Sequence, residues 1–302
     1  MGFLKILVIV VSDVAITMQL SFETWLKRTN HFPDSYFMRV TDTQKSFWDD
    51  HSYLVFPGLF ANQASNLSKW VDEISQWKAD NTPWLTFFEM DAPDQLSRIE
   101  NFVPSHKGLG DVLNGKCILD IVSQLMGEPG ILYKDRINFK LPGGGAHAAH
   151  QDGVAYDQSG QEQFDSNAKP YLSVLISVDA STDENGVFEV ANNWKHDSLE
   201  ILSMESPRPD HPSFTKIAKS VEDELDWVKI YTQPGDAVIF TERIPHRSES
   251  NRSNTRRRIL YGVYNPISFG DRRGTYFAAK REAPNDARYM VGNPHARVGK
   301  TK

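Results

Sequence analysis

At 302 residues, the chain is long enough for one large β domain or for two smaller domains. Its composition, 40% hydrophobic and 11% aromatic, excludes an intrinsically disordered protein. A net charge of −6 gives no basic excess, so we do not expect nucleic acid as a partner. The single Cys117 excludes an intramolecular disulfide and a zinc site built on paired cysteines, and it favours a reducing compartment, the cytoplasm.

Residues 1–42 are interpreted as an N-terminal extension. Residues 3–11 are apolar except for Lys5, but Asp13 follows soon after. The apolar run is much shorter than the roughly 20 residues that an α-helix needs to cross a bilayer. We therefore expect no stable membrane anchor.

The part of the domain before residue 130 is predicted to be rich in helices. A short helix is expected over 43–50, then a strand over 53–56 that ends at Pro57-Gly58. Apolar residues recur at spacings of three and four from Leu67 to Trp77, which predicts an amphipathic helix over 64–77. A further helix is expected over 108–126, with Gly127 as its stop signal.

From Gly130 the pattern changes to short segments rich in β-branched and aromatic residues, separated by glycine turns. Strands are expected over 131–141, 171–178, 186–190, 227–231, 237–240 and 259–264. Such a series predicts a sandwich or a jelly roll in a single domain over 43–282. Residues 192–226 are expected to be an irregular insertion or lid, and residues 283–302 an irregular C-terminal tail.

His150-Gln151-Asp152 is the most informative motif of the chain and follows a run of three glycines. On a strand, positions 150 and 152 would point the same way and could hold one metal ion. His246, at the end of the apolar run that starts at Ala237, is the expected third ligand. Two imidazoles and one carboxylate leave three octahedral positions open, which is typical of non-haem Fe(II) oxygenases.

Six motifs in order resemble the phytanoyl-CoA dioxygenase family of Fe(II)- and 2-oxoglutarate-dependent oxygenases, over about residues 47–264. They are 53–60 (YLVFPGLF), 137–140 (INFK), 150–152 (HQD), 183–186 (DENG), 234–236 (PGD), and His246-x-Ser248 with Asn251 and Arg257. The resemblance implies a mainly β fold with flanking helices around a double-stranded β-helix, that is, a jelly-roll, cupin-like core.

The resemblance also implies roles for individual residues. His150, Asp152 and His246 would bind Fe(II), with 2-oxoglutarate and O2 as co-substrates. Arg257 would pair with the distal carboxylate of 2-oxoglutarate, the Ser248 hydroxyl would assist with the same carboxylate, and Asn138 would face the co-substrate. Because side chains alternate along a strand, Arg257 should face away from Arg256 and Arg258.

The implied reaction is oxidation of a small molecule, a natural-product scaffold or a small metabolite, with release of succinate and CO2. Hydroxylation is favoured, and desaturation or rearrangement stay open. We expect Tyr156, Trp194 and Arg247 to line the substrate site. A homodimer is left open.

Two alternatives to this enzyme stay open. A non-catalytic jelly-roll binding protein would lack a metal ligand. A cupin-type metalloenzyme that does not use 2-oxoglutarate would more often have three or four histidines and no positioned arginine.

Overall fold

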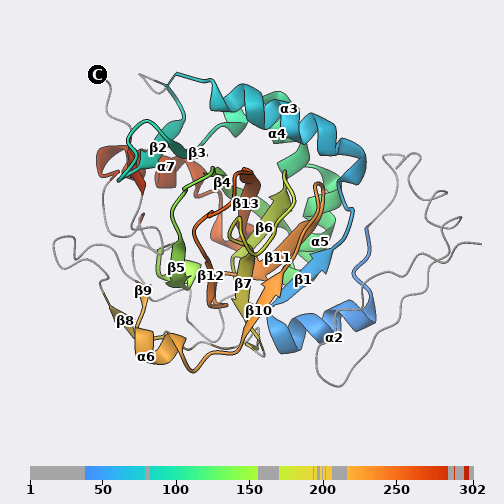
Figure 1. The fold of residues 1–302 in the computed structure, drawn as a ribbon. Helices are drawn as coiled ribbons and strands as arrows, with labels where there is room; N and C mark the ends of the chain where they lie inside the picture. The colour runs from blue at the N-terminus through green and yellow to red at the C-terminus, as the bar shows by residue number, and fades with distance from the viewer. Residues whose placement is uncertain are drawn as a thin grey trace, which may run out of the picture. The chain divides into compact units, whose positions relative to one another are not determined.

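The computed structural model describes residues 38–78, 82–155, 170–192 and 216–284, with short stretches at 194–195, 198, 200, 202–205, 289 and 296–298. Contacts divide the chain into two units, Met1–Tyr36 and Phe37–Lys302. Every element described below lies in the second unit (Figure 1). Among the described residues, no helix combines the length and apolarity that a membrane span requires.

Two antiparallel sheets form the core. The larger has the order β1-β11-β6-β13-β4-β3-β2-β14, and the smaller has the order β10-β7-β12-β5. The strands of the larger sheet are β1 Tyr53–Phe56, β2 Leu85–Glu89, β3 Leu96–Glu100, β4 Gly130–Lys140, β6 Leu172–Ser177, β11 Ala237–Thr241, β13 Arg257–Pro266 and β14 Ala296–Val298. Those of the smaller sheet are β5 His147–His150, β7 Phe188–Ala191, β10 Trp227–Ile230 and β12 His246–Ser248. This arrangement confirms the expected jelly roll.

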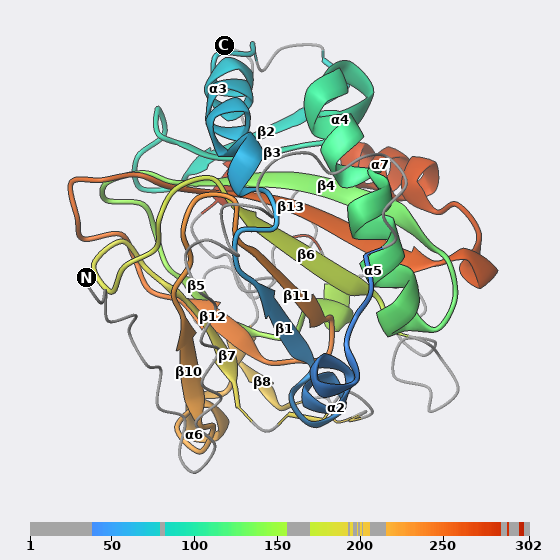
Figure 2. The same cartoon turned by 90° about the vertical axis from the view of Figure 1, so that its right-hand side faces the viewer.

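Helices α3, α4 and α5 cover the face of the larger sheet that is turned away from the smaller one (Figure 2), whereas α6 and α7 pack in other apolar clusters. The helices are α2 Asp42–His51, α3 Ala64–Ser75, α4 Lys107–Leu113, α5 Lys116–Met126, α6 Lys219–Glu222 and α7 Arg273–Glu282. In α3 the expected apolar face is buried through Leu67, Val71 and Ile74. Each such side chain contributes about 1.5–3 kcal/mol when it leaves water. The helices thus hold the outer face of the sheet and leave its inner face for the site.

Strand β13 contributes side chains to two different apolar clusters, one on each of its faces. Ile259 and Tyr261 join the apolar cluster between the two sheets. Leu260 and Tyr264 belong to the cluster under the helices. The inner face of β13 is therefore directed toward β5, β7 and β12, where the site residues lie.

Two glycine turns predicted from sequence require positive φ and close backbone packing. Gly186 has φ +80°, and a Cβ there would come within 2.1 Å of the Glu249 carbonyl oxygen. Gly235 has φ +89°, and a Cβ there would come within 2.6 Å of the backbone at Phe60 and Ala61. Only glycine fits these positions without a shift of the neighbouring chain.

Several boundaries differ from the sequence-based expectations. The single helix expected over 108–126 is two helices, because the Asn114 side chain bonds back to the Gly110 carbonyl oxygen and Gly115 is extended. Strands β2 and β3 were missed in the part expected to be helical. The tail after Glu282, expected to be irregular, contributes β14, which pairs with β2. The described part of the insertion at 192–226 contains β8 Met204–Glu205, β9 Lys216–Ile217 and α6.

Candidate metal centre

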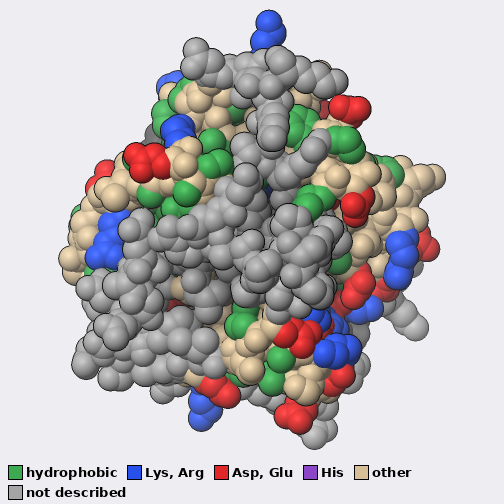
Figure 3. Space-filling model, turned by 90° about the vertical axis from the view of Figure 1, so that its left-hand side faces the viewer, with side chains coloured by type: hydrophobic (Ala, Val, Ile, Leu, Met, Phe, Trp, Pro, Cys, Tyr) green, Lys and Arg blue, Asp and Glu red, His purple; other side chains and the backbone are tan. Residues whose placement is uncertain are grey.

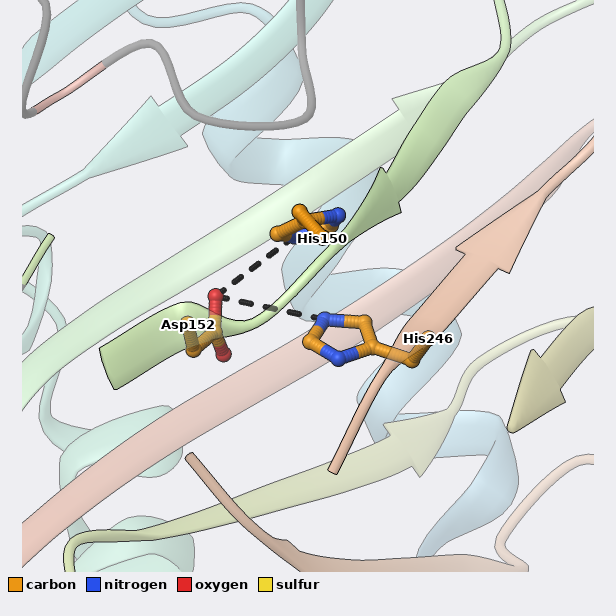
Figure 4. Close-up of side chains that lie close together, drawn as sticks. All are labelled: His150, Asp152 and His246. Atoms are coloured by element: carbon orange, nitrogen blue, oxygen red, sulfur yellow. Dashed lines mark ion pairs between the residues drawn. The ribbon is translucent and has the colours of Figure 1, made fainter. Parts of the chain in front are cut away.

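His150, Asp152 and His246 lie together, and each offers one ligand atom within 4.8 Å of the others. Nε2 of His150 is 3.6 Å from Oδ1 of Asp152, and Nε2 of His246 is 3.9 Å from the same oxygen. The close-up in Figure 4 shows both imidazoles turned toward this carboxylate. All three residues are buried. The spacing of the ligand atoms suits a single metal ion that is bound by all three side chains.

The local structure that brings the ligands together differs from the expected one. His150 ends β5, and Asp152 opens the 3₁₀ turn η3 Asp152–Ala155 rather than continuing the strand. His246 is not the end of the apolar strand β11, which stops at Thr241 in the other sheet; it is the first residue of β12. A turn that begins at Glu242 separates the two strands. His246 then pairs in register with His150 on β5.

Hydrogen bonds fix the orientation of each ligand. Nδ1 of His150 lies 2.7 Å from the Ala148 carbonyl oxygen, and Nδ1 of His246 lies 3.0 Å from that of Ile244. A carbonyl can only accept, so Nδ1 donates in both rings and each Nε2 is left to bind a metal. Ser173 donates to Oδ2 of Asp152 over 3.2 Å. Oδ1 of Asp152 is thereby directed toward the two rings.

The charge states also suit a metal. Burial, followed by the charge of His150, lowers the pKa of His246 to about 3, so its ring is neutral at pH 7. Burial alone would raise the pKa of Asp152, but the hydrogen bond with His150 and the charge of His246 hold it well below its usual range. A neutral imidazole and an ionised carboxylate are the forms that bind Fe(II).

A cavity of about 390 Å³, partly open to solvent, lies beside the ligands. Its described lining residues include four cationic side chains and no Asp or Glu. The lining comprises Arg136, Asn138, Lys140, His147, His150, Phe188, His246, Arg247, Ser248, Arg257, Ile259 and Tyr261. The cavity is therefore suited to anions bound next to a metal.

Arg257 is buried in the wall of this cavity. Its Nε and Nη1 have no hydrogen-bond partner among the described residues, and burial lowers its pKa to about 10, with Tyr261 opposing the shift. Its neighbours face elsewhere: Arg258 binds Asp179, and Arg256 pairs with Asp72 near the surface. A buried guanidinium with unused donors is a fit for a ligand carboxylate.

Ser248 and Lys140 form a pair across the two sheets. The Lys140 ammonium donates to Oγ of Ser248 over 2.7 Å and also to the Glu249 carbonyl oxygen. An ammonium has no acceptor, so the hydroxyl must accept here and keeps its own proton for another partner. Asn138, two residues before Lys140, also lines the cavity, and its Oδ1 has no described partner.

The expected substrate residues have three different outcomes. Tyr156 lies outside the described residues. Trp194 is partly buried against two apolar clusters and is not among the described lining residues. Arg247 contributes to the lining, but its guanidinium binds Glu189 and Glu222. The charge of Arg247 is therefore already matched by protein carboxylates.

Sequence reasoning missed two cations of the lining, Arg136 and Lys140. Both lie on β4, on the same face as Asn138, because residues two apart on a strand point the same way. The strand itself was expected over 131–141. Alternation from Asn138 could therefore have identified both residues.

Comparison with known proteins gives one consistent result. The family model "Phytanoyl-CoA dioxygenase (PhyH)" matches residues 48–259. The chain is 36% identical to the 2-aminoethylphosphonate dioxygenase of Uncultured bacterium HF130_AEPn_1, over 87% of this chain and 95% of that protein. It is also 36% identical to the methylphosphonate hydroxylase of Gimesia maris, over 81% of this chain and 88% of that protein.

The fold agrees with solved structures. EctD from S. alaskensis, crystallised with 2-oxoglutarate and 5-hydroxyectoine, superposes with a TM-score of 0.61 at 17% identity, over 76% of this chain and 77% of that chain. The matched family segment includes all three predicted iron ligands and Arg257. With its His-Asp-His ligand set and a buried arginine in the cavity wall, this chain is an Fe(II)- and 2-oxoglutarate-dependent dioxygenase and belongs to the phytanoyl-CoA dioxygenase family.

Proposed function

We propose that this enzyme hydroxylates a C–H bond of a small organophosphonate, with 2-oxoglutarate and O2 consumed and succinate and CO2 released. Two relatives that are 36% identical over most of their length carry phosphonates in their names. Each turnover would place one oxygen atom of O2 in the C–H bond and the other in succinate. The reaction is then balanced without a further reductant.

The charge of the cavity is the observation that carries the phosphonate assignment. Its described lining has cations and no carboxylate, whereas the surface drawn in Figure 3 carries acidic and basic side chains side by side. This cavity is partly open to solvent, so a small anion can enter it beside the metal ligands. Of the two substrate classes expected from sequence, these features favour the small metabolite over the natural-product scaffold.

In this proposal the three ligands and Arg257 have separate tasks. His150, Asp152 and His246 hold the metal through Nε2, Oδ1 and Nε2. Arg257 pairs with the distal carboxylate of 2-oxoglutarate through its unused donors. Iron with bound 2-oxoglutarate supplies the oxidising chemistry by decarboxylating the keto acid with O2.

Ser248 and Asn138 complete the co-substrate site. The Ser248 hydroxyl accepts from Lys140, so its proton is available for the same carboxylate that Arg257 binds. Asn138 offers its amide from the neighbouring strand. The apolar Phe188, Ile259 and Tyr261 side chains exclude water around these polar groups, which strengthens each charged hydrogen bond.

The test is direct. Enzyme loaded with Fe(II) is incubated with 2-oxoglutarate and with methylphosphonate or 2-aminoethylphosphonate, and succinate is quantified while phosphorus NMR follows the product. We expect succinate and a hydroxylated phosphonate in equal amounts, and neither with Asp152→Ala. Succinate formation no higher with either phosphonate than without substrate would overturn the proposal.

Compartment and assembly stay predictions. The single Cys117 is partly buried and free, which is compatible with the reducing cytoplasm. A homodimer can be tested by sedimentation of the purified protein.

A further inference from the structure

His147, the first residue of β5, lines the cavity, and the proposed function assigns it no role. Its Nε2 is buried and has no hydrogen-bond partner among the described residues. Leaving a buried polar atom without a partner costs free energy, which a ligand that bonds to the atom offsets. His147 is therefore a candidate for direct contact with a bound molecule.

An extra residue in β5 directs the His147 side chain into the cavity. Simple alternation along the strand would place His147 with Ala149, which packs in a separate apolar cluster. On β12, His246 pairs with His150. Ser248, two residues later, pairs with His147, which is three residues from His150, so β5 has one residue more than β12 between the pairs. Such an extra residue reverses the alternation, and His147 and His150 both face the cavity.

The pairing with Ser248 puts His147 at the end of the cavity where the distal carboxylate of 2-oxoglutarate is expected. The metal pair, His246 and His150, lies one step earlier along the same two strands. Arg257 lines the same cavity. His147 is thus placed on the Ser248 side of the metal ligands, within the group of residues that would hold this carboxylate.

The His147 ring is neutral at pH 7. Burial lowers its pKa well below the usual range, and the charges of Lys140 and Arg136 act in the same direction. A neutral imidazole has one N–H donor and one acceptor nitrogen. Nε2 can therefore donate a hydrogen bond to an anion, while Arg257 and Lys140 supply the positive charge.

The bonds already made around Ser248 decide which donors remain for a ligand. The Lys140 ammonium has three donors, and the Ser248 hydroxyl and the carbonyl oxygens of Ser248 and Glu249 accept from it. His147 and Arg257 are not bonded to each other, since both have buried nitrogens without a described partner. A carboxylate has about four acceptor sites, enough for Arg257, the Ser248 hydroxyl and His147 at once.

We propose that Nε2 of His147 donates a hydrogen bond to the distal carboxylate of 2-oxoglutarate, as a third donor beside Arg257 and the Ser248 hydroxyl. The inference rests on the part of the proposed function that assigns Arg257 to this carboxylate, and it does not depend on the substrate. Because β5 carries both His147 and the metal ligand His150, the strand fixes the distance between the metal and this donor. The site would then select a keto acid of the length of 2-oxoglutarate.

The experiment compares two keto acids that differ only at the distal end. Anaerobic Fe(II) enzyme is titrated with 2-oxoglutarate and, separately, with 2-oxopentanoate, which has a methyl group in place of the distal carboxylate. The visible absorption band gives both Kd values, and metal analysis gives the iron content. The variants are His147→Ala, His147→Gln and His147→Asn, with Arg257→Met as the reference for loss of the carboxylate site. His51→Ala is the matched control, since His51 stacks on Phe47 and is not among the described lining residues.

We expect His147→Ala to raise the Kd of 2-oxoglutarate about 20-fold, as for loss of one hydrogen bond to a charged acceptor. His147→Gln should stay within about threefold of wild type, because its amide nitrogen reaches about as far as Nε2. His147→Asn reaches only about as far as Nδ1 and should lose as much as His147→Ala. The Kd of 2-oxopentanoate and the iron content should be the same in wild type, the His147 variants and His51→Ala.

The outcomes separate this inference from the proposed function. If Arg257→Met loses 2-oxoglutarate but His147→Ala binds it as tightly as wild type, the inference is wrong and the proposed co-substrate site stands. Equal losses for both keto acids in His147→Ala, or a lower iron content than in His51→Ala, would also overturn it. If Arg257→Met binds 2-oxoglutarate as tightly as wild type, the co-substrate site of the proposed function fails, and the inference fails with it. Should His147→Ala not fold, the difference between His147→Gln and His147→Asn decides the matter.

Discussion

The ammonium of Lys140 lies 2.7 Å from the hydroxyl of Ser248, and this contact joins the larger sheet to the smaller one at the wall of the cavity. Lys140 can only donate, so the contact determines which way the Ser248 proton can point. Lys140, for which the sequence predicted no role, thereby orients Ser248, which was expected to bind the co-substrate.

Replacing Lys140 tests this orientation. Lys140→Met should raise the Kd of 2-oxoglutarate about 10-fold, comparable to Ser248→Ala, because the hydroxyl loses the partner that orients it. The double variant should be little weaker than either single variant. Titration of the visible band of the anaerobic Fe(II) complex measures all three. Lys45→Met, at an exposed position of α2, is the control; additive losses in the double variant would contradict the coupling.

Removal of one metal ligand should abolish both metal and co-substrate binding. His150→Ala leaves two ligands, so we expect less than a tenth of the wild-type iron content after anaerobic loading, and no visible band with 2-oxoglutarate. Metal analysis and absorption spectra check the result. His51→Ala is the control. His51 stacks on Phe47 and is not one of the three ligands, so this variant should load iron normally.

Metal binding should also stabilise the fold. A metal ion that is bound by these three buried side chains in the folded state alone stabilises that state by about 2.7 kcal/mol at a free metal concentration 100 times the Kd. Thermal unfolding with and without Mn(II), an ion of similar ligand preference, measures the gain. Asp152→Ala should show no gain, and an equal gain in that variant would place the ion elsewhere.

Acid should destabilise the protein partly through Glu100. Burial would raise the pKa of this carboxyl, but Lys280 and Arg98 lower it to about 2, against 4.5 ordinarily. The folded state therefore binds the proton less readily than the unfolded state, so its contribution is present above pH 4.5 and is lost as the pH falls toward 2. The shift corresponds to on the order of 3 kcal/mol.

Urea unfolding of wild type and Glu100→Gln between pH 7 and 2 tests this contribution. The variant should be less stable at pH 7, because Lys280 and Arg98 lose their shared counter-charge. Its stability should also fall less steeply than that of wild type below pH 4.5. Parallel curves for the two proteins would show that Glu100 does not carry the effect.

Two glycines with the same φ allow the cost of backbone strain to be measured apart from the cost of steric overlap by a new Cβ. Gly186 and Gly143 have φ of +80° and +81°, but a Cβ at Gly186 would meet the Glu249 carbonyl oxygen and one at Gly143 would meet nothing within 4 Å. Gly143→Ala should cost about 1–2 kcal/mol from φ alone. Gly186→Ala should cost clearly more and should also weaken 2-oxoglutarate binding, since residue 249 follows Ser248. Equal losses of unfolding free energy would contradict this.

Most strands of the larger sheet were predicted from their β-branched and aromatic residues, including β4 with its charged inner face, but β2 and β3 were missed. In β3, Arg98 and Glu100 are buried, so the strand lacks the polar and apolar alternation that marks a half-buried strand. The ligands themselves were identified by residue type and order. Their convergence depends on the pairing of β5 with β12, a long-range contact that no local spacing encodes. Arg257 was assigned from the family resemblance and separated from Arg256 and Arg258 by alternation, and the same rule applied to β4 would have revealed Arg136 and Lys140.

The division of the site between two sheets has a consequence for the motions of the protein. Two iron ligands, His150 and His246, come from the smaller sheet, whereas Arg257 comes from the larger one. A 2-oxoglutarate molecule bound to both metal and Arg257 would link the sheets, so separating them would require release of the co-substrate. Metal and 2-oxoglutarate should each slow the hydrogen exchange of the β5 and β12 amides. With both ligands bound, the exchange should be slower than the sum of these two separate effects predicts.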